Sequence, residues 1–267
     1  MARAAQSLCR LVLIVGLTLS LLPLQWVAVR LGMRLAERIP LLYHRIVCRI
    51  VGLRIERRGE MCTARPTLFA CNHMSYLDVS VLGALIPGSF VAKREVADWP
   101  FFGWLAKLQR CVFVERRPGR AVGQRDEMTE RLAAGDNLIL FPEGTSSDGT
   151  RVIPFRSALF SAAERRAGGA PITVQPVSIA YSKLGGLPMP RYMRPYLAWY
   201  GEMQLVSHLW DVLGLAPVTV VVEFHQPVTI EQFASRKELA AHCQAIAAAG
   251  VSAAIHGVAP RAAAMGA

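Results

Sequence analysis

The stretch TLFACNHMSYLDVSVLGALI, residues 67–86, indicates how this chain is built. It opens with a short apolar run, Thr67–Cys71, which is typical of a buried strand. The second half is apolar again, and Ser75 stands three residues before Asp78, the spacing of a helix capping box. We therefore predict a strand, a polar loop and a helix over Tyr76–Leu85.

Short β-rich runs alternate with helical stretches along the rest of the chain. The other expected strands are Leu53–Arg57, Ser89–Ala92, Cys111–Val114, Asn137–Phe141, Thr173–Ala180, Leu197–Gly201 and Thr219–Phe224. The other expected helices are Phe101–Gln109, Gly119–Ala134, Ser157–Arg166, Gln204–Leu213 and Ile230–Ala249. This alternation predicts an α/β fold with a mixed, mostly parallel central sheet flanked by helices. We expect this domain to occupy residues 53–250, after a membrane-associated helical segment, 1–52, and before a flexible tail, 251–267.

The N-terminal segment is the most apolar part of the chain. Leu11–Val29 is long enough to cover the hydrocarbon core of a bilayer as a helix. A cleaved signal peptide is the alternative, because Arg3 and Arg10 precede the apolar run. However, Trp26-Val27-Ala28 lacks the small-x-small cleavage pattern. We favour an uncleaved hydrophobic helix, either spanning the membrane or forming part of a helical hairpin.

A series of arginines follows this apolar segment: Arg30, Arg34, Arg38, Arg45 and Arg49. They fall within an arc of roughly 100° if the helix is continuous and Pro40 does not break it. Two interpretations are open: a solvated basic face on a core helix, or an interfacial helix on anionic head groups. By the positive-inside rule, these arginines place this end of the segment in the cytoplasm.

Composition and motif spacing argue against a nucleic-acid partner, disulfide bonds and a zinc site. The net charge of +11 suits anionic lipid, phosphate-bearing molecules or nucleic acid. No zinc-finger spacing, RNP-like aromatic run or lysine/arginine block supports nucleic acid, so we expect none. The six cysteines are scattered without a C-x-x-C, which argues against disulfides or a zinc site and indicates a reducing compartment.

His73 and Asp78 are the first candidates for chemistry. Five residues apart on one helix, they would point about 140° away from each other. They can meet if His73 lies in the loop and Asp78 in the first helical turn. A neutral imidazole can then take a proton from an alcohol while the carboxylate fixes its tautomer. The alternative is that Asp78 only caps the helix and His73 only closes a turn.

Two further segments end expected strands. The run FPEGTSSDG, residues 141–149, leaves a buried strand, and such loops commonly bind ligands in α/β sheets. Its Glu143 and backbone amides would hold a polar head group, unless the run is only a Pro/Gly turn. The run VFVERR, residues 112–117, would present a guanidinium to an anion, unless it is only a strand end reaching solvent.

Taken in order, these motifs resemble the lysophospholipid acyltransferase family, which includes 1-acylglycerol-3-phosphate acyltransferase. The matching blocks are His73 to Asp78, Val112 to Arg116, Phe141 to Thr145 and Val174 to Ser178. The resemblance implies acyl transfer from a coenzyme A or acyl carrier protein thioester to a lysolipid hydroxyl, without metal or redox cofactor. It makes His73 the general base and Asp78 its orienting partner. It also assigns acceptor binding to Arg116, Glu143, Gly144 and Thr145, and a pocket wall to Pro176.

The third block departs from the family pattern. Many lysophosphatidate enzymes continue it with Thr-Arg, whereas this chain has Thr145-Ser146. The block looks more like that of the bacterial branch that acylates lyso-ornithine lipid, which we rank ahead of lysophosphatidate as the acceptor. Arg110 stands where the family often has glycine. The resemblance implies a bacterial inner-membrane enzyme with its catalytic domain on the cytoplasmic face. A membrane-anchored lipid-binding protein with a degenerate acyltransferase site is the alternative.

Overall fold

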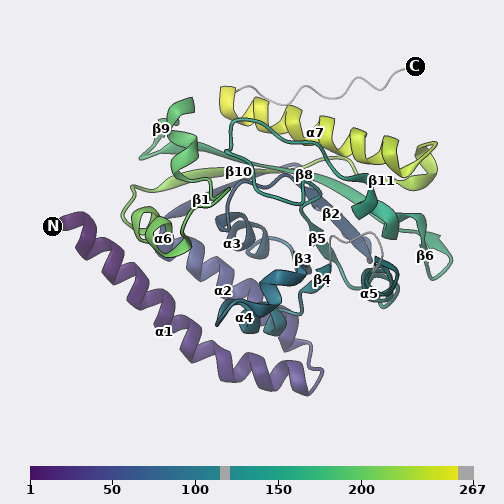
Figure 1. Ribbon diagram of the computed structural model, residues 1–267, viewed down its shortest axis with the longest axis horizontal. Coiled ribbons are helices and arrows are strands. Elements are labelled where there is room, and N and C mark those ends of the chain that lie inside the picture. Colours follow the sequence, from purple (N-terminus) through teal and green to yellow (C-terminus); the bar gives the residue numbers. More distant parts are fainter. Residues whose placement is uncertain (115–120, 258–267) are drawn as a thin grey trace.

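The structure is a computed structural model that describes residues 1–114 and 121–257 (Figure 1). Its helices are α1 (Ala2–Arg30), α2 (Leu35–Val51), α3 (Leu77–Gly83), α4 (Phe102–Leu108), α5 (Ala121–Ala133), α6 (Leu205–Leu213) and α7 (Arg236–His256). Short 3-10 helices are η1 (Arg94–Asp98), η2 (Ser157–Glu164), η3 (Arg191–Tyr196) and η4 (Ile230–Gln232). The main strands are β1 (Leu53–Arg58), β2 (Thr67–Cys71), β3 (Ser89–Lys93), β4 (Val112–Val114), β5 (Leu138–Leu140), β8 (Thr173–Leu184) and β10 (Val218–Phe224). The two-residue strands are β6 (Arg166–Ala167), β7 (Ala170–Pro171), β9 (Leu187–Pro188) and β11 (Val228–Thr229).

The central sheet has the strand order β1-β10-β8-β2-β5-β3-β4. Strands β8, β2, β5, β3 and β4 are parallel, and β10 runs antiparallel to β8 and parallel to β1. The predicted mixed, mostly parallel sheet is therefore confirmed. Because β2, β5, β3 and β4 point the same way, the loops that leave them gather at one edge of the sheet.

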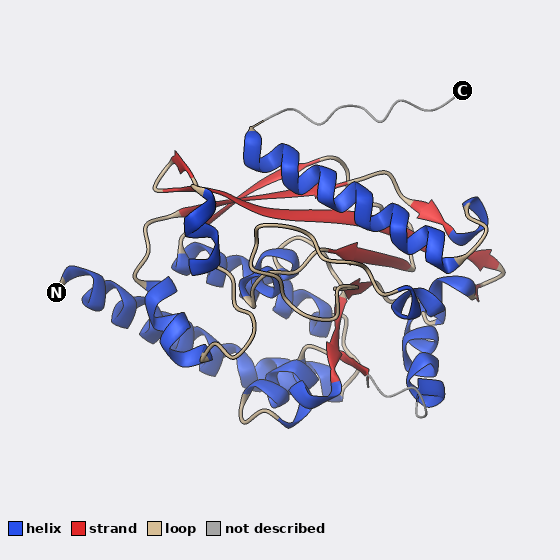
Figure 2. Ribbon diagram, turned by 45° about the horizontal axis from the view of Figure 1, so that its top comes forward, coloured by secondary structure: helices blue, strands red, loops and turns tan. Residues whose placement is uncertain are grey.

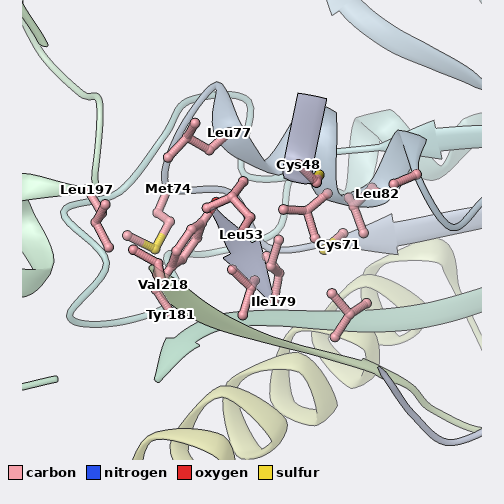
Figure 3. Close-up of a cluster of buried hydrophobic side chains, with 14 of the residues drawn as sticks. Cys48, Leu53, Cys71, Met74, Leu77, Leu82, Ile179, Tyr181, Leu197 and Val218 are labelled. Carbon is pink, nitrogen blue, oxygen red and sulfur yellow. The ribbon is translucent and has the colours of Figure 1, made fainter. Parts of the chain in front are cut away.

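Helices cover both faces of this sheet. Figure 2 shows α7 lying across one face, while α2 and α3 lie beneath the other. Side chains of β2 alternate between the two cores: Phe69 packs into the α2–α3 side, and Leu68 into the α5–α7 side. Both are fully buried, which explains why β2 is apolar throughout. Figure 3 shows part of the α2–α3 core, with Met74, Leu77 and Tyr181 close to the end of β2.

Helices α1 and α2 form a hairpin along the flank of the domain. Each has a proline inside it, and α2 continues through Pro40 without a break. Pro40 has no N–H to donate to the carbonyl of Ala36, four residues earlier. The buried side-chain amide of Gln25 on α1 donates to that carbonyl at 3.1 Å, and to the carbonyl of Leu108 at 2.8 Å. Gln25 therefore compensates for the missing helical hydrogen bond.

The polar face of α1 is turned toward the protein. Ser7 donates to the carbonyl of Trp210, and Arg10 donates to those of Leu213 and Leu215 at 2.9 and 3.0 Å. Apolar side chains lie on the opposite face, where Val12 and Leu19 are 61% and 59% exposed. Of the described helices, α1 and α7 are long and apolar enough to cross a membrane. Helix α7 packs along β8, however, so it is a core helix in this fold.

Three segments differ from the sequence predictions. Leu197–Gly201 is irregular, because the backbone of Trp199 donates to the carbonyl of Met74 rather than to a strand. Most of Ser157–Arg166 is the 3-10 helix η2. Helix α7 begins at Arg236, after the N-cap Ser235, and continues to His256. The helix therefore extends six residues into the expected tail, because Val251 and Ala254 pack against Ala180 and Val221.

Candidate active site

His73 and Asp78 meet at the edge of the sheet. His73 lies in the loop after β2, and Asp78 lies in the first turn of α3. Nδ1 of His73 is 2.8 Å from Oδ2 of Asp78. A carboxylate only accepts hydrogen bonds, so Nδ1 carries the proton and Nε2 keeps a free lone pair. The His73 side chain is 20% exposed, whereas that of Asp78 is fully buried. No described residue forms a hydrogen bond with the other ring nitrogen, Nε2, which stays available to an alcohol.

The Asp78 carboxylate is held by more than the imidazole. Its Oδ2 also accepts hydrogen bonds from the backbone N–H groups of Met74 and Ser75, at 2.8 and 2.9 Å. The predicted capping box is half formed: Ser75 N–H reaches Asp78, but Ser75 Oγ accepts from Leu77 N–H at 3.4 Å. Asp78 therefore both closes the loop that carries His73 and orients its ring.

Tyr181 is a member of this network that sequence reasoning missed. Its hydroxyl donates to Oδ1 of Asp78 at 2.8 Å, across 103 residues of sequence. Burial, followed by the charge of Asp78, raises the pKa of the Tyr181 phenol well above its ordinary value. The phenol stays protonated and acts only as a donor to the carboxylate. Tyr181 lies on β8, and no sequence signal links it to Asp78.

Glu143 lies beside the pair but faces inward. Its Oε1 accepts from the backbone N–H of His73 at 2.8 Å, and its Oε2 from that of Ile153 at 3.3 Å. The residue is 1% exposed. Burial, opposed by these two hydrogen bonds and reinforced by Asp78, raises the pKa of Glu143 to about 8. In this structure Glu143 therefore supports the His73 backbone, and its predicted contact with an acceptor head group stays a prediction.

The loop after β5 forms the floor beneath His73. The Phe141 ring stacks on the His73 imidazole, with ring centroids 4.0 Å apart. The backbone N–H of Ser147 donates to the carbonyl of His73 at 2.9 Å. Gly144 has a φ of 67°, which favours glycine, and it turns the loop between these two contacts. Gly144 and Thr145 are both half-buried on this loop, next to the pair.

Two predicted site residues remain, Arg116 and Pro176. Arg116 falls outside the described residues. Pro176 is buried within β8, in register with Ala70 of β2, so it belongs to the sheet and not to the loop that carries His73. Asn72 was not predicted as a site residue, yet its buried amide exchanges two hydrogen bonds with the backbone of Ile179, at 3.0 and 2.9 Å. Asn72 thereby fixes the start of the loop that carries His73 against β8.

Known proteins are similar to this chain in sequence and in fold. A family model described as Acyltransferase matches residues 53–180. The chain is 46% identical to a lyso-ornithine lipid O-acyltransferase from Brucella abortus, over 85% of this chain and 86% of the relative. It is 40% identical to a second protein of that name from Rhizobium meliloti, over 87% and 81%.

A more distant relative and a solved structure extend the comparison. A 1-acyl-sn-glycerol-3-phosphate acyltransferase from Neisseria gonorrhoeae is 31% identical over 65% of this chain and 64% of the relative. The crystal structure of PlsC, a 1-acyl-sn-glycerophosphate acyltransferase from Thermotoga maritima, has a TM-score of 0.63 and 23% identity over 92% of this chain and 96% of that one, and shows the same fold. The two relatives from Brucella abortus and Rhizobium meliloti, each aligned with more than four fifths of the chain, show that this protein belongs to the acyltransferase family.

Proposed function

We propose that this acyltransferase moves a fatty acyl group from an acyl thioester to the free hydroxyl of lyso-ornithine lipid. The observation that carries the chemistry is the 2.8 Å contact between His73 and Asp78, which leaves Nε2 for an alcohol. The acceptor is supported by relatives from Brucella abortus and Rhizobium meliloti that carry that activity in their names.

In this mechanism the lysolipid hydroxyl lies against Nε2 of His73. The imidazole takes the hydroxyl proton as the oxygen attacks the thioester carbonyl, and buried Asp78 stabilises the imidazolium that forms. The carbon–sulfur bond then breaks, and the thiolate of coenzyme A or acyl carrier protein leaves and takes up the proton. General-base catalysis of this kind contributes on the order of 10²–10⁴ in rate.

The test is a purified enzyme assay with two acceptors and two donors. Lyso-ornithine lipid and 1-acylglycerol-3-phosphate are each supplied with acyl carrier protein and coenzyme A thioesters. Ornithine lipid formed by the wild type, and not by His73→Ala, would support the proposal. Phosphatidate as the only product would instead favour the second candidate, which rests on the Neisseria gonorrhoeae relative. Product formation by His73→Ala at the wild-type rate would refute the base assignment.

The location we propose is the cytoplasmic leaflet of a bacterial inner membrane. Helix α1 holds the domain with its polar face and exposes its apolar face. Exposed aromatic side chains lie near it, on and around α4: Trp99, Phe101, Phe102 and Trp104. Aromatic side chains of this kind are enriched at membrane interfaces. We infer that α1 lies along the bilayer surface without crossing it, because crossing would take the docked flank of the domain into the hydrocarbon.

Labelling of position 2 separates the two orientations. In a Cys9→Ser background, Ala2→Cys introduces a thiol at the exposed start of α1. An α1 that lies in the cytoplasmic leaflet leaves this thiol unreactive to an impermeant maleimide in spheroplasts and reactive in inside-out vesicles. The Cys9→Ser parent gives the background in both preparations. Labelling in spheroplasts above that background would show that α1 spans the membrane.

A further inference from the structure

Three arginines lie along the loop that supports His73: Arg151 and Arg191 lie near Asp148, and Arg194 lines a cavity with the next residue, Gly149. Arg151 follows Asp148 in sequence, and Arg191 and Arg194 come from η3. The Thr150 hydroxyl and backbone N–H, with Arg151 and Arg191 nearby, hold the pKa of Asp148 below its ordinary value. Its Oδ1 accepts both Thr150 groups, at 2.7 and 2.9 Å. Among the described residues, none of the three guanidinium groups forms an ion pair within 4.0 Å.

The buried end of this cluster lacks a partner. Nε of Arg194 is buried and has no hydrogen-bond partner within the part of the chain that the structure describes. Arg194 and Arg151 both line a small cavity together with Ser147 and Gly149. A buried donor without a partner costs free energy, as does the close approach of like charges. An anion at the mouth of this cavity would remove both costs.

Residues that line the cavity also contact His73 or follow it in sequence. Ser147, which lines it, donates its backbone N–H to the carbonyl of His73. Met74, the residue after His73, lines it too. Ser146 does not supply a cation, and its hydroxyl is bound to the carbonyl of Trp199 at 2.5 Å. The positive charge beside this loop therefore comes from η3 and from Arg151.

The residues around these arginines are of the kind found at the depth of lipid head groups in a membrane. Tyr192 and Tyr196 of η3 are 74% and 68% exposed, and they alternate along the chain with Arg191 and Arg194. Tyrosine side chains combine an apolar ring with a polar tip and favour the membrane–water interface. We therefore favour the acidic group of a lipid head group over that of a soluble molecule as the ligand of these arginines.

We propose that Arg151, Arg191 and Arg194 form the subsite that binds the acidic group of the acceptor's head group, the carboxylate in lyso-ornithine lipid. This rests on the proposed function. In that acceptor the carboxylate stands only a few bonds from the reacting hydroxyl, so both have to bind close to His73. A guanidinium fork matches a carboxylate or a phosphate in two parallel hydrogen bonds. The phosphate of a pantetheine donor carries the same chemistry, and the experiment separates the two sources.

The experiment crosses protein variants with acceptor variants. Arg194→Gln and Arg191→Gln are assayed with lyso-ornithine lipid and with its methyl ester, which lacks the negative charge. We expect the wild-type KM for the acceptor to rise about tenfold with the methyl ester, the size typical of a lost hydrogen bond to a charged group. Each variant should show a raised KM for the free acid and little further change with the ester.

Two controls keep the outcomes distinct. Arg165→Gln removes an exposed arginine that does not line the cavity, and it should keep the wild-type preference for the free acid. Arg191 is exposed, so its variant remains informative even if Arg194→Gln fails to fold. Variants that keep the wild-type preference, or that raise only the KM for the thioester, would overturn the inference. A wild type that does not acylate lyso-ornithine lipid at all would overturn the proposed function instead.

Discussion

The Tyr181 hydroxyl donates to Oδ1 of Asp78 at 2.8 Å, and His73 binds the other oxygen of the same carboxylate. Tyr181 therefore stabilises the negative charge of the carboxylate that contacts the imidazole. We predict that Tyr181→Phe lowers kcat about tenfold and leaves the KM for the acceptor unchanged, because the lost bond is charge-assisted and distant from the lipid. Initial rates over a range of acceptor concentrations measure both constants.

The matched control for Tyr181→Phe is Tyr76→Phe. Tyr76 is also a tyrosine beside the loop that carries His73, but its hydroxyl bonds to Nδ1 of His208 at 3.0 Å. Tyr76→Phe should lower thermal stability and leave kcat near the wild-type value. Equal losses of kcat in Tyr76→Phe and Tyr181→Phe would show that Tyr181 only supports packing.

Removal of each member of the pair should have a different signature. His73→Ala should lower kcat by about 10²–10⁴ and leave the melting temperature near that of the wild type, because the ring lies partly at the surface. Asp78→Asn should lower both, because the amide cannot accept from His73, Met74 and Ser75 as the carboxylate does. Differential scanning fluorimetry beside initial rates checks this, and equal stability of the two variants would contradict it.

Glu143 gives the stability of the fold a dependence on pH. Its folded pKa of about 8 lies above the ordinary value, so the folded chain binds this proton more tightly than the unfolded chain does. Its contribution is complete at low pH and is lost as pH rises toward 8. Burial lowers the pKa of His44 and His225 to about 4, so their opposite effect is confined to lower pH.

We therefore predict that the melting temperature of the wild type falls between about pH 6.5 and 8.5 more steeply than that of Glu143→Gln. The glutamine variant cannot ionise in this range, although it loses part of the bonding to His73 and Ile153. Melting curves at four pH values, normalised to pH 6.5 for each protein, would reveal the difference. Parallel slopes in the two proteins would rule out Glu143 as the titrating group.

Gln25 should couple the two N-terminal helices. Gln25→Leu leaves the buried carbonyls of Ala36 and Leu108 without this donor, at roughly 1–3 kcal/mol for each unsatisfied group. We expect the melting temperature to fall by about 5–10 °C. Pro40→Ala restores an N–H that can reach the Ala36 carbonyl, so it should stabilise Gln25→Leu more than it stabilises the wild type. Equal gains in both backgrounds would contradict this link.

Sequence patterns predicted most strands and the meeting of His73 with Asp78, because both depend on local rules. The period of an apolar run identifies a strand such as β2, and a loop–helix boundary brings two residues five apart together. Tyr181 escaped prediction because its contact depends on which strands lie side by side, and β8 pairs with β2 across about a hundred residues. The inward orientation of Glu143 could not be predicted either, because its hydrogen bond to Ile153 depends on the path that the loop takes between the two residues.

The orientation of α1, with its polar face toward the domain and its apolar face outward, has a practical consequence for the purification of this enzyme in water. Deletion of the hydrophobic helix is the usual remedy for an insoluble membrane protein. Here the deletion would strip hydrogen-bond donors from the carbonyls of Leu108, Leu213 and Leu215, which belong to the catalytic body. The more promising remedy is to keep the helix and replace outward-facing residues such as Val12 and Leu19 with polar ones.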